Sequence, residues 1–169
     1  HTDDLLHATA TASKGETVAL TFKHLMHRLV VNLIAGDGME GVDLSSALIN
    51  SAARDGMPTM LLGVEVNLLT GAVSYNSTTD GINLSNGFNG NADWIVAPQD
   101  LTAGEEWLKI TVSKDGNEDV WYYHVPADLN TAEPGNQTRL ESGKRLTLNL
   151  TLKKDQQTGK TEVELTASE

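Results

Sequence analysis

The stretch RLTLNLTLK, residues 145–153, carries the strongest structural signal in the chain. Every second residue from Leu146 to Leu152 is a leucine, and threonine or asparagine occupies the positions between them. This period of two predicts a β-strand with one apolar face and one polar face. The polar segment DQQTGK follows, and TEVELTA then alternates again, with Val163 and Leu165 on the apolar side. The two runs therefore predict a β-hairpin.

The same alternation recurs in runs separated by glycine, asparagine, aspartate and serine. Three further pairs of runs fit it: WLKITV with VWYYHV (107–112 and 120–125), VEVNL with AVSY (64–68 and 72–75), and LHATA with VALTF (6–10 and 18–22). About nine or ten short strands result, which is typical of a sandwich. One-sided alternation also favours antiparallel over buried parallel sheets. We therefore expect an all-β, antiparallel β-sandwich.

The composition suits one globular domain and excludes several classes of function. The chain has 169 residues, of which 39% are hydrophobic and 21% charged, enough for a core of its own. Its formal net charge of −11 argues against nucleic-acid binding, because no basic stripe is present to neutralise phosphates. The absence of cysteine excludes disulfides and thiolate chemistry. No apolar run in the sequence is long enough to span a bilayer.

The segment FKHLMHRLVVNL, residues 22–33, breaks the alternation. The apolar residues change from even to odd positions: Val18, Leu20 and Phe22, then Leu29, Val31 and Leu33. A straight strand would turn its apolar side chains to the solvent halfway along. We therefore predict a bulge or a single helical turn between Lys23 and Arg28, with Leu25 joining the second apolar set.

Two histidines at i and i+3 in this segment raise the question of a metal site. On a helical turn, His24 and His27 could face each other. Zinc needs three or four ligands, but the chain has no cysteine and no HExxH motif, and its other histidines are scattered. We therefore predict no metal and no cofactor. His24 is expected to bond backbone groups freed by the bulge, and His27 is expected to face water.

Two further segments lack clear alternation. GVDLSSALINSAARDG, residues 41–56, is the best helix candidate, with Asp43 or Ser45 as N-cap and Gly56 at its end. Its irregular apolar spacing leaves helix and non-helix equally open, so we expect at most one short helix or helical turn. Residues 76–93 are rich in Asn, Gly, Ser and Thr, and they predict a long loop of the kind that is often functional or mobile.

Three segments carry motifs that occur together in one protein family. The first, residues 3–33, has a short strand after Asp4, a polar turn, and then Phe22 and His24 ahead of a Val/Leu run. The second, IVAPQDLTAGEEWLKITV, keeps Pro98 and Gln99 but inserts Ala97 before them. The third, LESGKRLTLNLTLK, keeps Gly143 and Lys144 before the strand, with Ser142 for the usual proline and Arg145 for the usual aromatic residue. In this order the segments resemble the fimbrillin-like (Mfa-like) proteins of Bacteroidetes.

The resemblance implies a transthyretin-like, Greek-key β-sandwich, forming a single domain over residues 1–169. Whether its first strands are missing stays open. The resemblance also implies export to the cell surface or outer membrane. In family members that form type V pili, a protease removes the first strand of each subunit, and a strand of the next subunit fills the groove. Such strand addition uses main-chain hydrogen bonds and alternating pockets. Neither Arg28 nor Arg54 matches the position of the family's processing site.

The leading functional hypothesis is therefore a structural or adhesion protein of the cell surface. Its partners would be other pilus subunits bound through strand exchange, or a surface receptor or glycan. The alternative is a carbohydrate-binding β-sandwich module, with Trp107 as the candidate binding residue because it alternates with Leu108 and Ile110. The competing interpretation is that large rings in strands are usually buried. An enzyme is least favoured, since GxSxG, P-loop and GxGxxG motifs are all absent, and we predict no catalytic residue.

Overall fold

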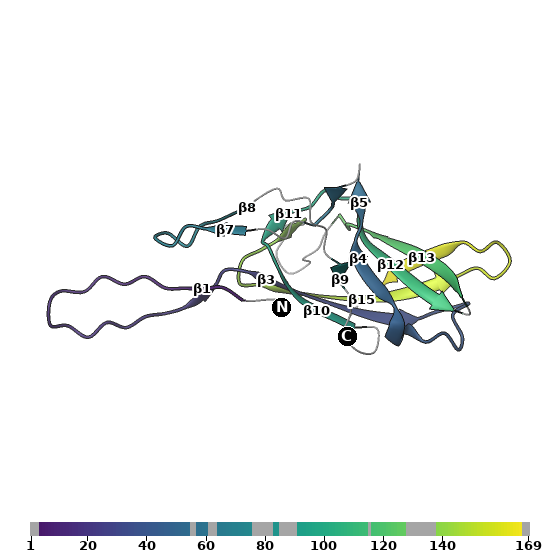
Figure 1. The fold of residues 1–169 in the computed structure, drawn as a ribbon, viewed down its shortest axis with the longest axis horizontal. Helices are drawn as coiled ribbons and strands as arrows, with labels where there is room; N and C mark the ends of the chain where they lie inside the picture. The colour runs from purple at the N-terminus through teal and green to yellow at the C-terminus, as the bar shows by residue number, and fades with distance from the viewer. Residues whose placement is uncertain are drawn as a thin grey trace.

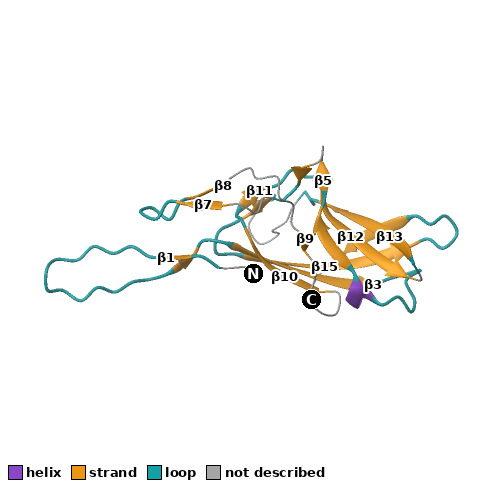
Figure 2. Cartoon of the chain, in the orientation of Figure 1, coloured by secondary structure: helices purple, strands orange, loops and turns teal. Residues whose placement is uncertain are grey.

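The computed structural model describes residues 4–54, 57–60, 64–75, 83–84, 91–114, 116–127 and 138–166. Over these residues the fold is all-β, with a single 3₁₀ turn, η1 (Leu44–Ser46), as the other regular element (Figures 1 and 2). This confirms the predicted fold class and the expectation of at most one helical turn.

The strands follow one another along the whole described chain. Their bounds are β1 (Leu6–His7), β2 (Lys23–His24), β3 (His27–Ala35), β4 (Leu48–Ser51), β5 (Ala53–Arg54), β6 (Met57–Pro58), β7 (Val64–Val66), β8 (Val73–Tyr75), β9 (Asn83–Leu84), β10 (Asn91–Val96), β11 (Gln99–Asp100), β12 (Glu106–Lys114), β13 (Asn117–His124), β14 (Arg139–Leu140), β15 (Arg145–Lys154) and β16 (Thr161–Leu165).

Two four-stranded sheets form the body of the molecule, with strand orders β10-β3-β15-β16 and β13-β12-β4-β9. The chain passes repeatedly from one sheet to the other, so each sheet combines distant parts of the sequence. Among the described residues, every strand pair is antiparallel except β3–β15, which is parallel. This single departure from an antiparallel sandwich places Arg145 opposite Arg28 and Leu152 opposite Ala35.

The apolar core lies between these two sheets. On β15, Leu148, Leu150 and Leu152 are at most 2% exposed, as the alternation predicts. On the other sheet, Ile49 of β4 and Ile110 of β12 are fully buried in the same apolar cluster. Burying one such side chain contributes about 1.5–3 kcal/mol, so the two alternating faces hold the sandwich together.

Side-chain hydrogen bonds join the two sheets along one side. The indole Nε1 of Trp121 on β13 donates to the carbonyl of Lys153 on β15 at 2.8 Å. The hydroxyl of Thr161 on β16 donates to the carbonyl of Val120 at 2.9 Å. The Lys154 ammonium binds both carboxylate oxygens of Asp119, at 2.7 and 2.6 Å.

Three of the four predicted hairpins form as expected: β15–β16, β12–β13 and β7–β8. The fourth, near the N-terminus, forms only at its base, where β1 pairs with β2. Residues 8–22 contain no strand, and they project from the body as a long excursion (Figure 1). Val18, Leu20 and Phe22 are 49%, 52% and 59% exposed. Alternation here predicted a strand, but none of the described strands pairs with these residues.

The helix candidate at residues 41–56 is a single 3₁₀ turn followed by strands. Asp43 is its N-cap, as predicted, and its carboxylate accepts a hydrogen bond from the backbone N–H of Ser45 at 2.8 Å. A longer helix is wrong, because Ala47 and Ile49 enter the core with the period of a strand. Of the predicted loop at 76–93, residues 76–82 and 85–90 lie outside the described residues, whereas β9 and the start of β10 fall within it.

Candidate functional site

The segment at residues 22–33 is interrupted at Leu25 and Met26. β2 ends at His24, a bend follows at Met26, and β3 begins at His27. Both residues at the interruption are 8% exposed, so Leu25 joins the buried set as predicted. The predicted interruption between Lys23 and Arg28 is therefore confirmed, and it is a bend rather than a helical turn. The first apolar set, Val18, Leu20 and Phe22, does not join the core.

The turn that precedes β15 satisfies the backbone of this bend. The Ser142 hydroxyl lies 3.1 Å from the His24 carbonyl and 2.9 Å from the Leu25 carbonyl, and the Gly143 N–H donates to the Met26 carbonyl at 2.8 Å. The Gly143 N–H thus pairs with the Met26 carbonyl, and the single Ser142 O–H is shared between the carbonyls of His24 and Leu25. Gly143 has a φ of 71°, and a Cβ at this position would lie 3.2 Å from the His24 carbonyl oxygen. Glycine therefore suits both the turn and the close approach.

The two histidines have roles opposite to those predicted. His27 is 3% exposed, and its Nδ1 donates to the Glu141 carbonyl at 2.8 Å. Burial lowers the pKa of His27, which the hydrogen bond to Glu141 only partly offsets. His24 is exposed, and its Nδ1 binds the carboxylate of Asp4. The expectation for His24 was wrong because the Ser142 hydroxyl and the Gly143 N–H already bond the backbone of the bend.

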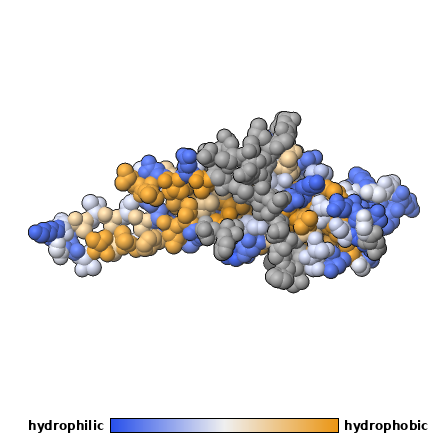
Figure 3. Space-filling model, in the orientation of Figure 1, coloured by the Kyte–Doolittle hydropathy of each residue, from blue (hydrophilic) through white to orange (hydrophobic). Residues whose placement is uncertain are grey.

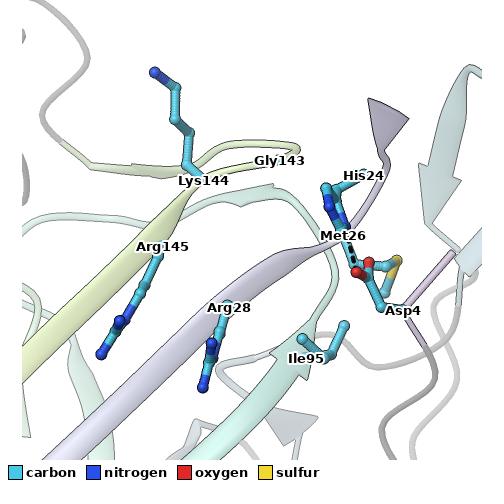
Figure 4. A pocket seen from close by; sticks show the side chains of 8 residues that line it. All are labelled: Asp4, His24, Met26, Arg28, Ile95, Gly143, Lys144 and Arg145. Carbon is cyan, nitrogen blue, oxygen red and sulfur yellow. Dashed lines mark hydrogen bonds and ion pairs between the residues drawn. The ribbon is translucent and has the colours of Figure 1, made fainter. Parts of the chain in front are cut away.

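A pocket of about 330 Å³ opens beside the bend (Figure 4). Its lining comes from four parts of the chain. These are the N-terminal segment with Asp4; the bend and the start of β3 with His24, Met26 and Arg28; β10 with Ile95; and the turn before β15 with Gly143, Lys144 and Arg145. Figure 4 shows the Arg28 and Arg145 side chains running side by side from the neighbouring strands β3 and β15. Three of the 12 Lys and Arg residues of the chain thus line one pocket of an acidic protein.

Asp93 on β10 is the carboxylate bound to Arg28. Its two oxygens accept hydrogen bonds from Nε and Nη2 of Arg28, at 2.9 and 2.6 Å. The hydrogen bond from Arg28 lowers the pKa of Asp93, and the charges of Arg28 and Arg145 lower it further. Arg28 thus binds both oxygens. Among the residues that the structure describes, the Arg145 side chain makes no hydrogen bond and no ion pair within 4 Å, although its charge acts on Asp93.

The pocket lies where the three motif-bearing segments meet. Segment 3–33 supplies the bend, segment 95–112 supplies Ile95, and segment 140–153 supplies the turn and Arg145. Sequence reasoning singled out His24, Gly143 and Lys144, but it did not assign a site to Arg28 or Arg145. The only sequence signal for those arginines was their polar position at the start of two alternating strands.

Trp107, the candidate for sugar stacking, is fully buried, so its proposed exposure was wrong. The register of β12 against β13 shifts between Glu106 and Leu108, which marks a β-bulge at Trp107. A bulge re-aims side chains, and here both Trp107 and Leu108 turn inward, at 0% exposure. The Trp107 ring packs against Tyr123, with the ring centroids 6.1 Å apart, and burial raises the pKa of Tyr123 to about 12.

Exposed apolar side chains gather instead at one end of the molecule, over the N-terminal excursion and the β7–β8 turn (Figure 3). We call this set the apolar projection; its members are Leu5, Leu6, Val18, Leu20, Phe22, Leu68 and Leu69. A hydrogen bond of 3.0 Å from His7 Nε2 to the Leu68 carbonyl joins its two parts. Leu68 and Leu69 are 83% and 86% exposed, and patches of this kind mark interaction surfaces.

Within the described part of the chain, no three His, Asp or Glu side chains are grouped so that they could hold a metal ion. The described residues also contain no helix with the length and apolar character that crossing a membrane requires.

Comparison with known proteins adds three findings. A family model described as fimbrillin-like matches residues 2–168. Two solved structures, of proteins with proposed roles in cell adhesion from Bacteroides ovatus and Bacteroides thetaiotaomicron, each give a TM-score of 0.50, at 17% and 18% identity. The alignments cover 89% and 99% of this chain, which spans 46% and 64% of those proteins. At such identities the likeness concerns the fold alone. No curated protein matches the chain.

Proposed function

Because this chain belongs to the fimbrillin-like family, we propose that it is a structural or adhesion protein displayed on the cell surface, and not an enzyme. Within that role, residues 17–22 add as a strand to the sheet of a neighbouring subunit. This chain spans 46% and 64% of the two proteins compared above. The role of the whole protein is therefore part of the proposal.

The proposal rests on residues 17–22, which have the alternation of a strand but are exposed and, in the part of the chain that the structure describes, unpaired. Val18, Leu20 and Phe22 alternate as in a strand, yet all three are about half exposed. No strand pairing or hydrogen bond involves residues 17–22 among the described residues. Unpaired backbone groups and a row of apolar side chains are the two features that a sheet edge recognises in an added strand.

The period of two supplies a matched pair of variants for the test. Leu20→Asp places a charge on the apolar face of the segment, and Thr21→Asp places the same charge on the opposite face. Both residues are exposed, so neither change should unfold the domain. The variants should therefore differ only where the apolar face is buried by a partner.

The assay is an unheated denaturing gel of surface material from cells that produce the protein, probed with an antibody against this chain. We expect a ladder that disappears on boiling for the native sequence and for Thr21→Asp, and mostly monomer for Leu20→Asp. The antibody should also label intact cells. A monomer band for the native sequence, an unchanged ladder for Leu20→Asp, or an absence of surface labelling would each contradict the proposal.

A further inference from the structure

We propose that the pocket beside the bend binds the carboxylate of an acidic sugar, held by the guanidinium group of Arg145 next to the Arg28–Asp93 ion pair. The proposal rests on the surface role given above, and it adds a ligand class and a site. It replaces sugar stacking on Trp107, which is buried, by recognition through charge.

Two like charges face each other on the neighbouring strands β3 and β15. Arg28 and Arg145 lie directly opposite each other in the parallel pair β3–β15, and strands in a sheet are only about 4.8 Å apart. Like charges in directly opposite positions destabilise a sheet. Asp93 offsets part of this repulsion, but both of its oxygens are bound by Arg28. An anion bound to Arg145 would give its guanidinium group a partner and relieve the repulsion.

The geometry of the arginine side chain suits a carboxylate ligand. A guanidinium group presents a planar fork of N–H donors, which matches the two oxygens of a carboxylate. Arg28 already shows this mode with Asp93, using two of its nitrogens. Arg145 is exposed and projects alongside it into the same pocket (Figure 4). A ligand carboxylate can therefore bind Arg145 in the mode that Arg28 uses for Asp93.

The size of the pocket and its other lining residues suit a single sugar ring. A volume of about 330 Å³ lies at the small end of the range for ligand sites, which suits one sugar ring better than a long chain. Ile95, which is partly exposed, supplies apolar surface for the C–H face of the ring, whereas Met26 is 8% exposed and adds little. Because Nδ1 of His24 is bound to Asp4, Nε2 is the ring nitrogen that remains for a ligand hydroxyl.

The charge of the whole chain favours a specific site over general attraction. With a formal net charge of −11, the protein repels anions at long range. An acidic ligand therefore gains attraction only where cations outnumber carboxylates. At this pocket Arg28, Lys144 and Arg145 stand against Asp4, which lines it, and Asp93, which is bound to Arg28. A polyanion that binds many surface sites is not expected.

The test measures binding to the purified chain by NMR, with galacturonic acid and glucuronic acid as probes and with galactose and glucose as neutral counterparts. Inorganic sulfate is a third arm, which separates carboxylate recognition from simple anion binding. We expect each acidic sugar to shift signals of Met26 and Ile95 and to bind at least tenfold more tightly than its neutral counterpart. Sulfate is expected to bind more weakly than the acidic sugars.

Variants then locate the site. Arg145→Gln should weaken binding of the acidic sugar at least tenfold, and Arg145→Lys should weaken it less, because the charge remains while the planar fork is lost. Arg139→Gln is the matched control, since Arg139 is an exposed arginine that does not line the pocket. Thermal unfolding of each variant establishes that it is folded.

Equal binding of acidic and neutral sugars, equal binding of sulfate, or unchanged binding by Arg145→Gln would overturn the inference. The outcome is distinct from that of the proposed function. Arg145→Gln should leave the heat-sensitive ladder intact, and Leu20→Asp should leave sugar binding intact. Loss of one property with retention of the other identifies which proposal fails.

Discussion

Replacement of Gly143 by alanine tests the contact on which the pocket is built. Gly143 has a φ of 71°, and an added Cβ would lie 3.2 Å from the His24 carbonyl oxygen. A left-handed conformation costs a non-glycine residue about 1–2 kcal/mol. The less flexible unfolded state of the alanine variant returns about 0.4–1 kcal/mol of this. Displacement of the bend by a few tenths of an ångström weakens the Ser142 bonds, at about 1 kcal/mol. The expected loss of stability for Gly143→Ala is therefore about 1.5–2 kcal/mol.

Gly159→Ala is the matched control for this change. Gly159 has a φ of 73°, and a Cβ there would meet no atom within 4 Å, so only the conformational cost applies. We expect this variant to lose about 0.5–1 kcal/mol. Both values are measured by urea unfolding at equilibrium, with the slope of the transition compared between variants. Equal losses for the two alanines would show that the turn does not press on the bend, and the description of the site would then be wrong.

Two further predictions concern the core and the buried histidine. Trp107→Ala should cost about 3–5 kcal/mol in unfolding free energy, as expected for a large ring removed from a packed core, whereas Tyr122→Ala on the exposed face of β13 should cost far less; similar losses for both would contradict the burial of Trp107. For His27, burial lowers the pKa in the folded state, so the imidazole is neutral in both states above about pH 6.5. As the pH falls below that value, the unfolded chain takes up a proton that the folded chain does not, and stability is lost until the lowered pKa is reached. His27→Asn keeps an N–H donor near the Glu141 carbonyl and removes the titrating imidazole. The difference in unfolding free energy between the native protein and His27→Asn should therefore change as the pH falls below about 6.5. A difference independent of pH would refute the lowered pKa of His27.

Local alternation predicted most of the sheet structure. Leu148, Leu150 and Leu152 follow a period of two, and the core has only to cover the face on which they lie. The change from even to odd positions around Lys23 predicted an interruption, and one occurs at Leu25 and Met26. The reason given for it was wrong, because the even set of Val18, Leu20 and Phe22 is exposed in the structure and lies in no strand. The alternation within one strand depends on neighbouring residues, which is why the sequence alone sufficed there.

The candidate site could not be predicted, because it depends on pairings between distant segments. Arg28 and Arg145 are 117 positions apart, and only the parallel pairing of β3 with β15 places them side by side. Alternation does not specify which strand lies beside which. The exposure of Trp107 was mispredicted for a related reason: a one-residue bulge reverses the direction of a side chain without any clear signal in composition.

The apolar projection shows a further limit of pattern reasoning. Val18, Leu20 and Phe22 have the alternation of a half-buried strand, and the structure leaves them exposed. A period of two states which side chains share a face, but it does not state what covers that face. In the proposed function, the covering sheet belongs to another subunit.

Hydrogen exchange of the backbone amides at residues 17–22 would show directly whether this segment is paired in a polymer. It would compare the purified chain with unheated polymer recovered from producing cells. In the isolated chain we expect fast exchange of these amides and slow exchange at β15. In the polymer we expect strong protection of residues 17–22. Protection of residues 17–22 in the isolated chain, or equally fast exchange in both samples, would contradict the account.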